Sequence, residues 1–303
     1  MRYPSDNDVE VKKVKVLGVD LGGTKIKIGI IDEKGSIKNT YVYPTVEPIY
    51  EKLEEAIDKV VSRHADIEAI GIGTPGFVDR KEGKVIFSSE NLPGWSGTEV
   101  KRKLEHRFRI PVKVENDANV AALAEVKHGA AIGYGNALML TLGTGVGGGV
   151  IVDGKILYGP NGAVGEFGHM ILYPEGHHCN CGRRGCQEQY VSGDSLQRRI
   201  REANMDLTPS ELMQSMEHNQ AARKIVDDFT YDLALSISSL QAAFDMEILI
   251  LGGGVSHSAE YWLKDLNKHL KSLLFHPLKV EVAKLKNDAG MIGAAELIFM
   301  EDK

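Results

Sequence analysis

The sequence has no long apolar run and no strong excess of positive charge. None of its hydrophobic stretches approaches the roughly 18 residues that a membrane-spanning helix needs. The opening segment, MRYPSDNDVEVKK, is polar and lacks the apolar core of a signal peptide. The net charge is -6, and the charges are mixed along the chain rather than gathered into runs. We therefore expect a cytoplasmic protein that binds neither membranes nor nucleic acids.

Cysteine is scarce and confined to one short loop. The chain has three cysteines, Cys179, Cys181 and Cys186. An odd number so close together makes a poor disulfide framework and a good metal site, and thiolates with imidazole favour Zn²⁺ over Mg²⁺. Gly182 and Gly185 would let the loop turn tightly around an ion, and His177 and His178 stand immediately before Cys179. Four protein ligands would leave no open position, so such a zinc would be structural. The alternative is three buried thiols without a metal.

The hydrophobic pattern predicts an α/β protein large enough for two domains. Of the 303 residues, 43% are hydrophobic and 26% charged, as in soluble globular proteins. Apolar runs predict strands at 15–21, 25–32, 37–43, 67–73 and 111–115, two strands within 137–157, and one at the start of 247–254. Helical spacing and composition predict helices at 48–63, 98–108, 116–130, 194–203, 209–216, 220–244, 259–274 and 289–299. Residues 74–79 and 174–185 are expected to be loops.

One sequence unit occurs twice. VDLGGTKIKIGIIDEKG and LTLGTGVGGGVIVDGKI each predict a strand, a glycine-rich turn and a second strand, with Asp32 and Asp153 at matching places. The similarity indicates a duplicated α/β architecture with a cleft between two lobes, although short repeats also arise by chance. We expect one lobe over residues 1–115 and the other over 116–303. The last helix, 289–303, could pack back on the first lobe.

Three glycine turns follow apolar strands and suit phosphate groups. Glycine lets backbone N–H groups approach a ligand closely, and successive N–H groups form a nest for anions. The hydroxyls of Thr24 and Thr144 add donors. The segment from Gly143 to Val150 also fits GxGxxG, but a strand rather than a helix follows it, so a dinucleotide fingerprint is rejected. Three ordinary tight turns are the alternative.

The motifs taken together resemble the ROK sugar kinases (repressor, open reading frame, kinase) of the actin/hexokinase ATPase superfamily. The resemblance runs from Val16 to Phe299. Its markers are DLGGTKI, TPG, ENLPGW, ENDANVAALAE, LGTGVGGG, GEFGH and CNCGRRGCQE, and the last two are the most specific.

The resemblance implies two RNase-H-like α/β lobes with ATP and sugar in the cleft between them. It implies a general base, Asp117, and a carboxylate that orients Mg²⁺, Asp20. The implied phosphate and adenosine contacts are Gly22, Gly23, Thr24, Lys25, Gly143, Thr144, Gly145, Gly253 and Gly254. The implied sugar contacts are Gly76, Asn91, Asn116, Asp117, Glu166, His169 and Glu188. The implied zinc ligands, within loop 169–188, are His169, Cys179, Cys181 and Cys186, with His177 and His178 as rivals of His169. A homodimer or higher homo-oligomer is also implied.

The chemistry of these residue types agrees with that assignment. Sugar hydroxyls both donate and accept hydrogen bonds, so a sugar site needs carboxylates and amides. Asn116 and Asp117 lie where a predicted strand meets a predicted helix, which would hold both side chains on a rigid frame. A simple helix N-cap is the alternative. Phosphoryl transfer then asks for alignment, charge neutralisation and a carboxylate that accepts the hydroxyl proton.

We accordingly expect an ATP-dependent hexose kinase, and among these kinases a glucokinase that forms glucose 6-phosphate is the first choice. N-acetylmannosamine and fructose kinases of the family share nearly all these residues, so they stay open. A second class is a sugar-responsive regulator without catalysis. Such regulators carry a DNA-binding domain before the kinase-like lobes, whereas the first strand here begins near Lys15.

Overall fold

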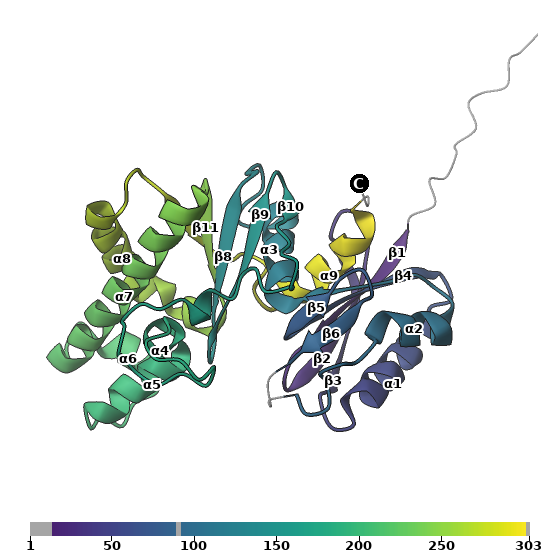
Figure 1. Cartoon of the computed structure of the whole chain (residues 1–303), viewed down its shortest axis with the longest axis horizontal. Coiled ribbons are helices and arrows are strands. Elements are labelled where there is room, and N and C mark those ends of the chain that lie inside the picture. The colour runs from purple at the N-terminus through teal and green to yellow at the C-terminus, as the bar shows by residue number, and fades with distance from the viewer. Residues whose placement is uncertain (1–13, 89–91, 301–303) are drawn as a thin grey trace, which may run out of the picture.

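Two mixed five-stranded sheets organise the chain, one in each lobe (Figure 1). The structure is a computed structural model that describes residues 14–88 and 92–300. The strand order is β3-β2-β1-β4-β7 in the first sheet and β10-β9-β8-β11-β12 in the second. In each sheet the first three strands pair antiparallel and the remaining pairs are parallel. The shared topology confirms the predicted duplicated α/β architecture of two RNase-H-like lobes.

The first lobe places its helices over a sheet of buried apolar strands. Its strands are β1 (Lys15–Leu21), β2 (Lys25–Ile31), β3 (Ile37–Pro44), β4 (Ile67–Thr74) and β7 (Val112–Asn116). Its helices α1 (Ile49–Val61) and α2 (Val100–Phe108) share one hydrophobic core with these strands. In α1, Leu53, Ile57 and Val60 recur at helical spacing and are fully buried.

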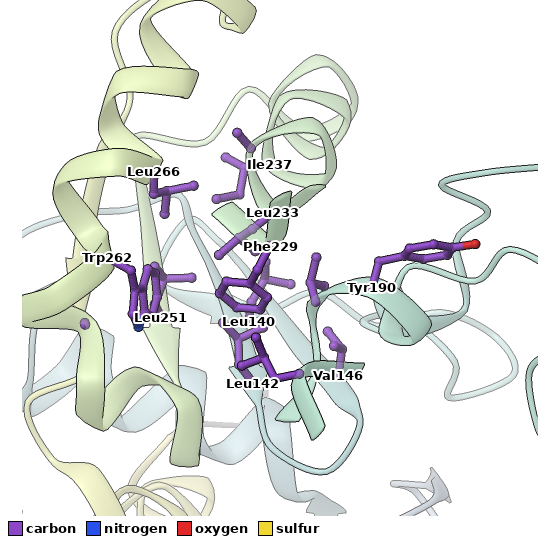
Figure 2. Close-up of a cluster of buried hydrophobic side chains, with 14 of the residues drawn as sticks. Leu140, Leu142, Val146, Tyr190, Phe229, Leu233, Ile237, Leu251, Trp262 and Leu266 are labelled. Carbon is purple, nitrogen blue, oxygen red and sulfur yellow. The ribbon is translucent and has the colours of Figure 1, made fainter. Parts of the chain in front are cut away.

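The second lobe packs a helical layer against its sheet. Its strands are β8 (Ala137–Leu142), β9 (Val146–Val152), β10 (Lys155–Ile156), β11 (Ile248–Gly252) and β12 (Lys279–Val282). Its helices are α4 (Glu188–Val191), α5 (Gly193–Glu202), α6 (Pro209–Ser215), α7 (Gln220–Phe244) and α8 (Ala259–Leu273). Figure 2 shows the side chains of Phe229 and Trp262 between these helices and the strand residues Leu140 and Leu251. The two rings meet edge to face, with centroids 5.7 Å apart.

Two helices, α3 (Asp117–His128) and α9 (Ala289–Phe299), pack on each other between the sheets (Figure 1). Their backbones approach so closely that a Cβ at Gly293 would lie 1.7 Å from the carbonyl oxygen of Val120. Helix α9 also packs against β1 and β4 of the first sheet, and α3 against β8 and β9 of the second. The start of α3, which carries the candidate base, is therefore held by both lobes.

A short hairpin corrects one prediction. Residues 74–79 were expected to be a loop, yet β5 (Phe77–Asp79) pairs with β6 (Lys84–Phe87). The Asp79 carboxylate accepts hydrogen bonds from the backbone N–H groups of Lys81 and Glu82, which closes the turn between the strands. Within the described residues, no helix combines the length and the apolar character needed to span a bilayer.

Candidate active site

A cavity of about 490 Å³ lies where the two lobes meet. Its lining includes Asp20 near the end of β1, Asp117 in the first turn of α3 and Gly253 in the turn after β11. Gly253 has a φ of 81°, and a Cβ there would lie 2.5 Å from the carbonyl oxygen of Leu142, so only glycine fits beside the end of β8. The cavity thus unites residues that the sequence placed far apart.

Two half-buried carboxyl groups, those of Asp20 and Asp117, dominate the electrostatics of this cavity. Burial and the charge of Asp117 raise the pKa of Asp20 to about 7, although Lys27 lowers it. Burial also raises the pKa of Asp117. The Lys27 ammonium donates to the side chain of Asp288 and the carbonyl of Asn287, so it is shared with other acceptors. Carboxylate oxygens are preferred ligands of Mg²⁺, and a divalent cation at Asp20 would offset this concentration of negative charge.

The other predicted phosphate contacts are not among the residues that line the cavity. These are Gly22, Gly23, Thr24 and Lys25 of the β1–β2 turn, Gly143, Thr144 and Gly145 of the β8–β9 turn, and Gly254. The β8–β9 turn is held against the start of α5, since the N–H of Gly193 donates to the carbonyl of Gly143 at 2.7 Å. The contacts of these glycine-turn residues with phosphate stay a prediction.

Asn116 joins two of the predicted sugar-binding segments. Its side-chain oxygen accepts from the N–H groups of Ala118 and Asn119, so it is the N-cap of α3. Its amide nitrogen donates to the carbonyl of Gly76 at 3.1 Å. One side-chain N–H remains for a ligand, so capping and sugar binding are compatible. Asn91 lies outside the described residues.

The remaining predicted sugar ligands, Glu166, His169 and Glu188, lie together beside Asp117. His169 Nε2 lies 3.9 Å from Glu166 Oε2, and His169 Nδ1 lies 3.8 Å from Glu188 Oε1. Burial raises the pKa of Glu166; the imidazole of His169 lowers it, and the charges of Asp117 and Glu188 raise it. Carboxylates of this kind accept hydrogen bonds from several hydroxyl groups at once.

Four side chains form a cluster with the geometry of a metal centre. The candidate ligand atoms of His169, Cys179, Cys181 and Cys186 all lie within 4.8 Å of one another. Cys179 Sγ is 3.7 Å from His169 Nδ1, and the sulfurs of Cys181 and Cys186 are 3.5 Å apart. A tetrahedral zinc with Zn–S bonds of about 2.3 Å separates its sulfurs by about 3.8 Å, so these residues fit the ion. Zinc would fix the loop and the ring of His169.

The rival histidines have other partners. His178 Nε2 lies 3.0 Å from a guanidinium nitrogen of Arg184, and the ring of His177 packs against the ring of Tyr190. Neither belongs to the candidate metal cluster. The geometry therefore favours His169 as the fourth ligand.

The structure adds polar residues that sequence reasoning missed. Ser256, His257, Lys286 and Asn287 line the cavity of Asp20 and Asp117. The first pair follows the glycine turn after β11 and the second follows β12, a strand that the sequence pattern did not predict. The glycine turn was the one available signal, since ligand-binding residues often follow such turns.

The comparisons with known proteins agree with this architecture of two α/β lobes around an interlobe cavity. The ROK family model matches residues 16–301, and the chain belongs to the ROK family. The glucokinase of Halalkalibacterium halodurans is 35% identical over 94% of this chain and 95% of its own length. The N-acetylmannosamine kinase of Vibrio cholerae is 34% identical over 93% of this chain and 98% of its own. The structure of a ROK glucokinase from Streptomyces griseus, in complex with glucose and AMPPNP, superposes with a TM-score of 0.81 at 34% identity, covering 93% of this chain and 98% of that one.

Proposed function

We propose that this protein is an ATP-dependent hexose kinase that transfers the γ-phosphoryl group of ATP to O6 of glucose, with Asp117 as the general base. The observation that carries the proposal is the position of Asp117. It lines the interlobe cavity together with Asp20. Its charge also acts on Glu166, which lies with His169 and Glu188 among the predicted sugar ligands. A sugar held by Glu166, His169 and Glu188 would thus meet a nucleotide held in the cavity at Asp117.

The environment of Asp117 suits a base for an alcohol. Burial raises its pKa, which makes the ionised form a stronger proton acceptor. In the proposed step the O6–P bond forms, the bond from phosphorus to the ADP oxygen breaks, and the O6 proton passes to Asp117. The hydroxyl becomes acidic only as the O6–P bond forms, so an ordinary carboxylate is basic enough.

Two metal ions fit this proposal in different roles. Mg²⁺ bound with ATP would neutralise phosphate charge, and Asp20 is the residue that would hold it. Zn²⁺ at His169, Cys179, Cys181 and Cys186 would be structural, because four protein ligands leave no open position. His169 Nδ1 faces the Cys179 sulfur and Nε2 faces Glu166, so zinc would orient a ring whose other nitrogen is directed to the sugar site.

Glucose is the preferred acceptor in this proposal because glucokinases match almost the whole chain. N-acetylmannosamine is the runner-up, supported by a kinase relative of similar identity. A purely regulatory protein is less well supported, since a sensor of sugar has no need of a desolvated carboxylate between the interlobe cavity and the proposed sugar ligands.

The direct test is sugar-dependent ADP formation by the purified protein with ATP and Mg²⁺, followed by NMR of the product. We expect ADP release that depends on glucose and a phosphorus nucleus coupled to the C6 protons. Saturable glucose binding without phosphoryl transfer would favour the regulatory alternative. ATP hydrolysis indifferent to every hexose would contradict the sugar-kinase proposal.

A further inference from the structure

A polar cluster at the boundary of the two lobes is formed by the exposed Arg80, the partly buried Tyr158 and the buried Glu115. Arg80 follows β5, Glu115 lies near the end of β7, and Tyr158 follows β10 of the other lobe. The guanidinium carbon of Arg80 stands 3.7 Å from the centre of the Tyr158 ring. Burial and the charge of Glu115 raise the pKa of Tyr158, whereas Arg80 lowers it, so all three groups lie close enough to act on one another. A cation stacked on an aromatic ring and a buried carboxylate therefore join the two lobes at one point.

The members of the cluster belong to three segments that carry proposed sugar contacts. Arg80 follows Gly76 across β5, and Glu115 immediately precedes Asn116 and Asp117. Tyr158 begins the stretch that runs to Glu166. The three segments come from distant parts of the sequence, and this cluster is a place where their side chains meet away from the cavity of Asp20 and Asp117.

Backbone packing transmits the position of one segment to the next. Gly162 has a φ of 67°, and a Cβ there would lie 2.8 Å from the carbonyl oxygen of Val78 in β5. The stretch between Tyr158 and Glu166 therefore presses directly on the hairpin that carries Arg80. A shift of the hairpin must move this stretch as well, because two backbones in contact cannot be compressed.

Glu115 connects the cluster to the start of α3. Only 4% of its surface is exposed. One carboxylate oxygen accepts from the backbone N–H of Asn116 at 2.7 Å and from the side-chain amide of Asn119 at 3.0 Å. A buried carboxylate needs such partners, and Arg80 supplies the positive charge that acts on it. The orientation of the first turn of α3, where Asp117 lies, thus depends on Glu115 and its partners.

We propose that Arg80 and Tyr158 are positioning residues that hold the three sugar-binding segments in register across the two lobes. The inference rests on the proposed hexose kinase function and adds a determinant of sugar affinity that touches neither sugar nor ATP. Since the cluster is tied to Gly76, Asn116 and Glu166 rather than to the glycine turns, its loss should weaken sugar binding and leave ATP binding nearly unchanged.

The test uses the full chain with Arg80→Met and Tyr158→Leu, singly and together. Each single variant should raise the KM for glucose about 2- to 5-fold, the range that loss of one solvent-exposed cation–aromatic contact implies. The KM for ATP should change less than about twofold. Because both variants break the same contact, the double variant should be close to the worse single variant. Arg80→Lys, which keeps the charge, and Tyr158→Phe, which keeps the ring, should each recover part of the loss.

Lys81→Met is the matched control. Lys81 follows Arg80 in the same turn, is exposed, and lines a cavity together with Arg80 and Tyr158. The variant therefore removes an equal charge without breaking the stacked pair. Its KM for glucose should stay within about twofold of the wild type. Calorimetric titration of glucose without ATP should reproduce the order of the KM values.

Unchanged glucose KM values in Arg80→Met and Tyr158→Leu would overturn the inference while the proposed function stands. Equal increases in the KM for glucose and for ATP, or a lower melting temperature without any change in glucose KM, would also overturn it, because either result describes a general structural role. A wild-type protein that neither binds nor phosphorylates a hexose would overturn the proposed function and this inference with it.

Discussion

Replacing Asp20 by asparagine should make the protein more stable and less active. A pKa that rises from 3.8 to about 7 means that ionised Asp20 costs the folded state roughly 4 kcal/mol above pH 7. Asparagine keeps the shape of the side chain and removes the charge, but it also loses the attraction of Lys27. We therefore expect Asp20→Asn to raise the free energy of unfolding by about 2–4 kcal/mol at pH 8.

The pH dependence distinguishes this cause from others. Between pH 4 and 7 the unfolded chain has lost the Asp20 proton and the folded protein keeps it, so the contribution of Asp20 to stability falls as pH rises. The advantage of Asp20→Asn should accordingly shrink to about 1–2 kcal/mol at pH 5. Urea unfolding followed by circular dichroism at both pH values, without nucleotide, measures the difference.

The exposed Asp153 provides the control, since Asp153→Asn removes the same charge and should change stability by less than about 0.5 kcal/mol. A variant Asp20→Asn that is no more stable than the wild type at pH 8, or whose advantage is the same at pH 5, would refute the account of Asp20 as a carboxylate that desolvation and the charge of Asp117 destabilise when it is ionised. Addition of ATP and Mg²⁺ should stabilise the wild type and have a much smaller effect on Asp20→Asn.

Three further predictions concern the metal, the sugar and the core. Metal analysis should find one zinc per chain. Cys179→Ser and His169→Ala should lose the zinc together with glucose affinity, whereas His177→Ala and His178→Ala should keep it. Loss of zinc from the last two variants alone would reverse the ligand assignment. In a panel of glucose, mannose, fructose and N-acetylmannosamine, glucose should have the highest kcat/KM, and a tenfold preference for another sugar, about 1.4 kcal/mol, would change the substrate but not the class of enzyme. Phe229→Ala, at a fully buried position of the second lobe, should cost about 3–5 kcal/mol in unfolding experiments, and a cost below 1 kcal/mol would contradict the packing in Figure 2.

Long elements with a clear period could be predicted from the sequence. The helix predicted at 220–244 is α7 with the same bounds, because its apolar spacing is regular and Asn219 caps its first turn through its side chain. The repeated strand–glycine–strand unit correctly indicated two lobes of one topology. These features depend on local hydrophobic periodicity, which a sequence displays directly.

Short elements could not be predicted, because tertiary contacts create them. β12 has four residues, none of them buried, and it forms by pairing with β11. The β5–β6 hairpin has a three-residue first strand that begins just after Gly76. Neither segment is long enough to show a period.

The candidate site likewise contains residues that the sequence predicts and residues that it does not. Motifs supplied Asp20, Asp117 and the cysteine loop, since each of these has a characteristic local sequence. The contact of Arg80 with Tyr158 has no local signal, because it joins side chains from different lobes. Residues that act through tertiary packing become visible only when the chain is folded.

The turnover of Asp117→Asn with saturating glucose and ATP tests the central claim most directly. Asparagine keeps the shape of the side chain and the N-cap of α3 belongs to Asn116, so the helix should form normally. It cannot accept the hydroxyl proton, and we predict that kcat falls by about 10² to 10⁴ while the circular dichroism spectrum and the melting profile remain those of a folded protein. A folded variant with near wild-type kcat would contradict the assignment of Asp117 as the general base.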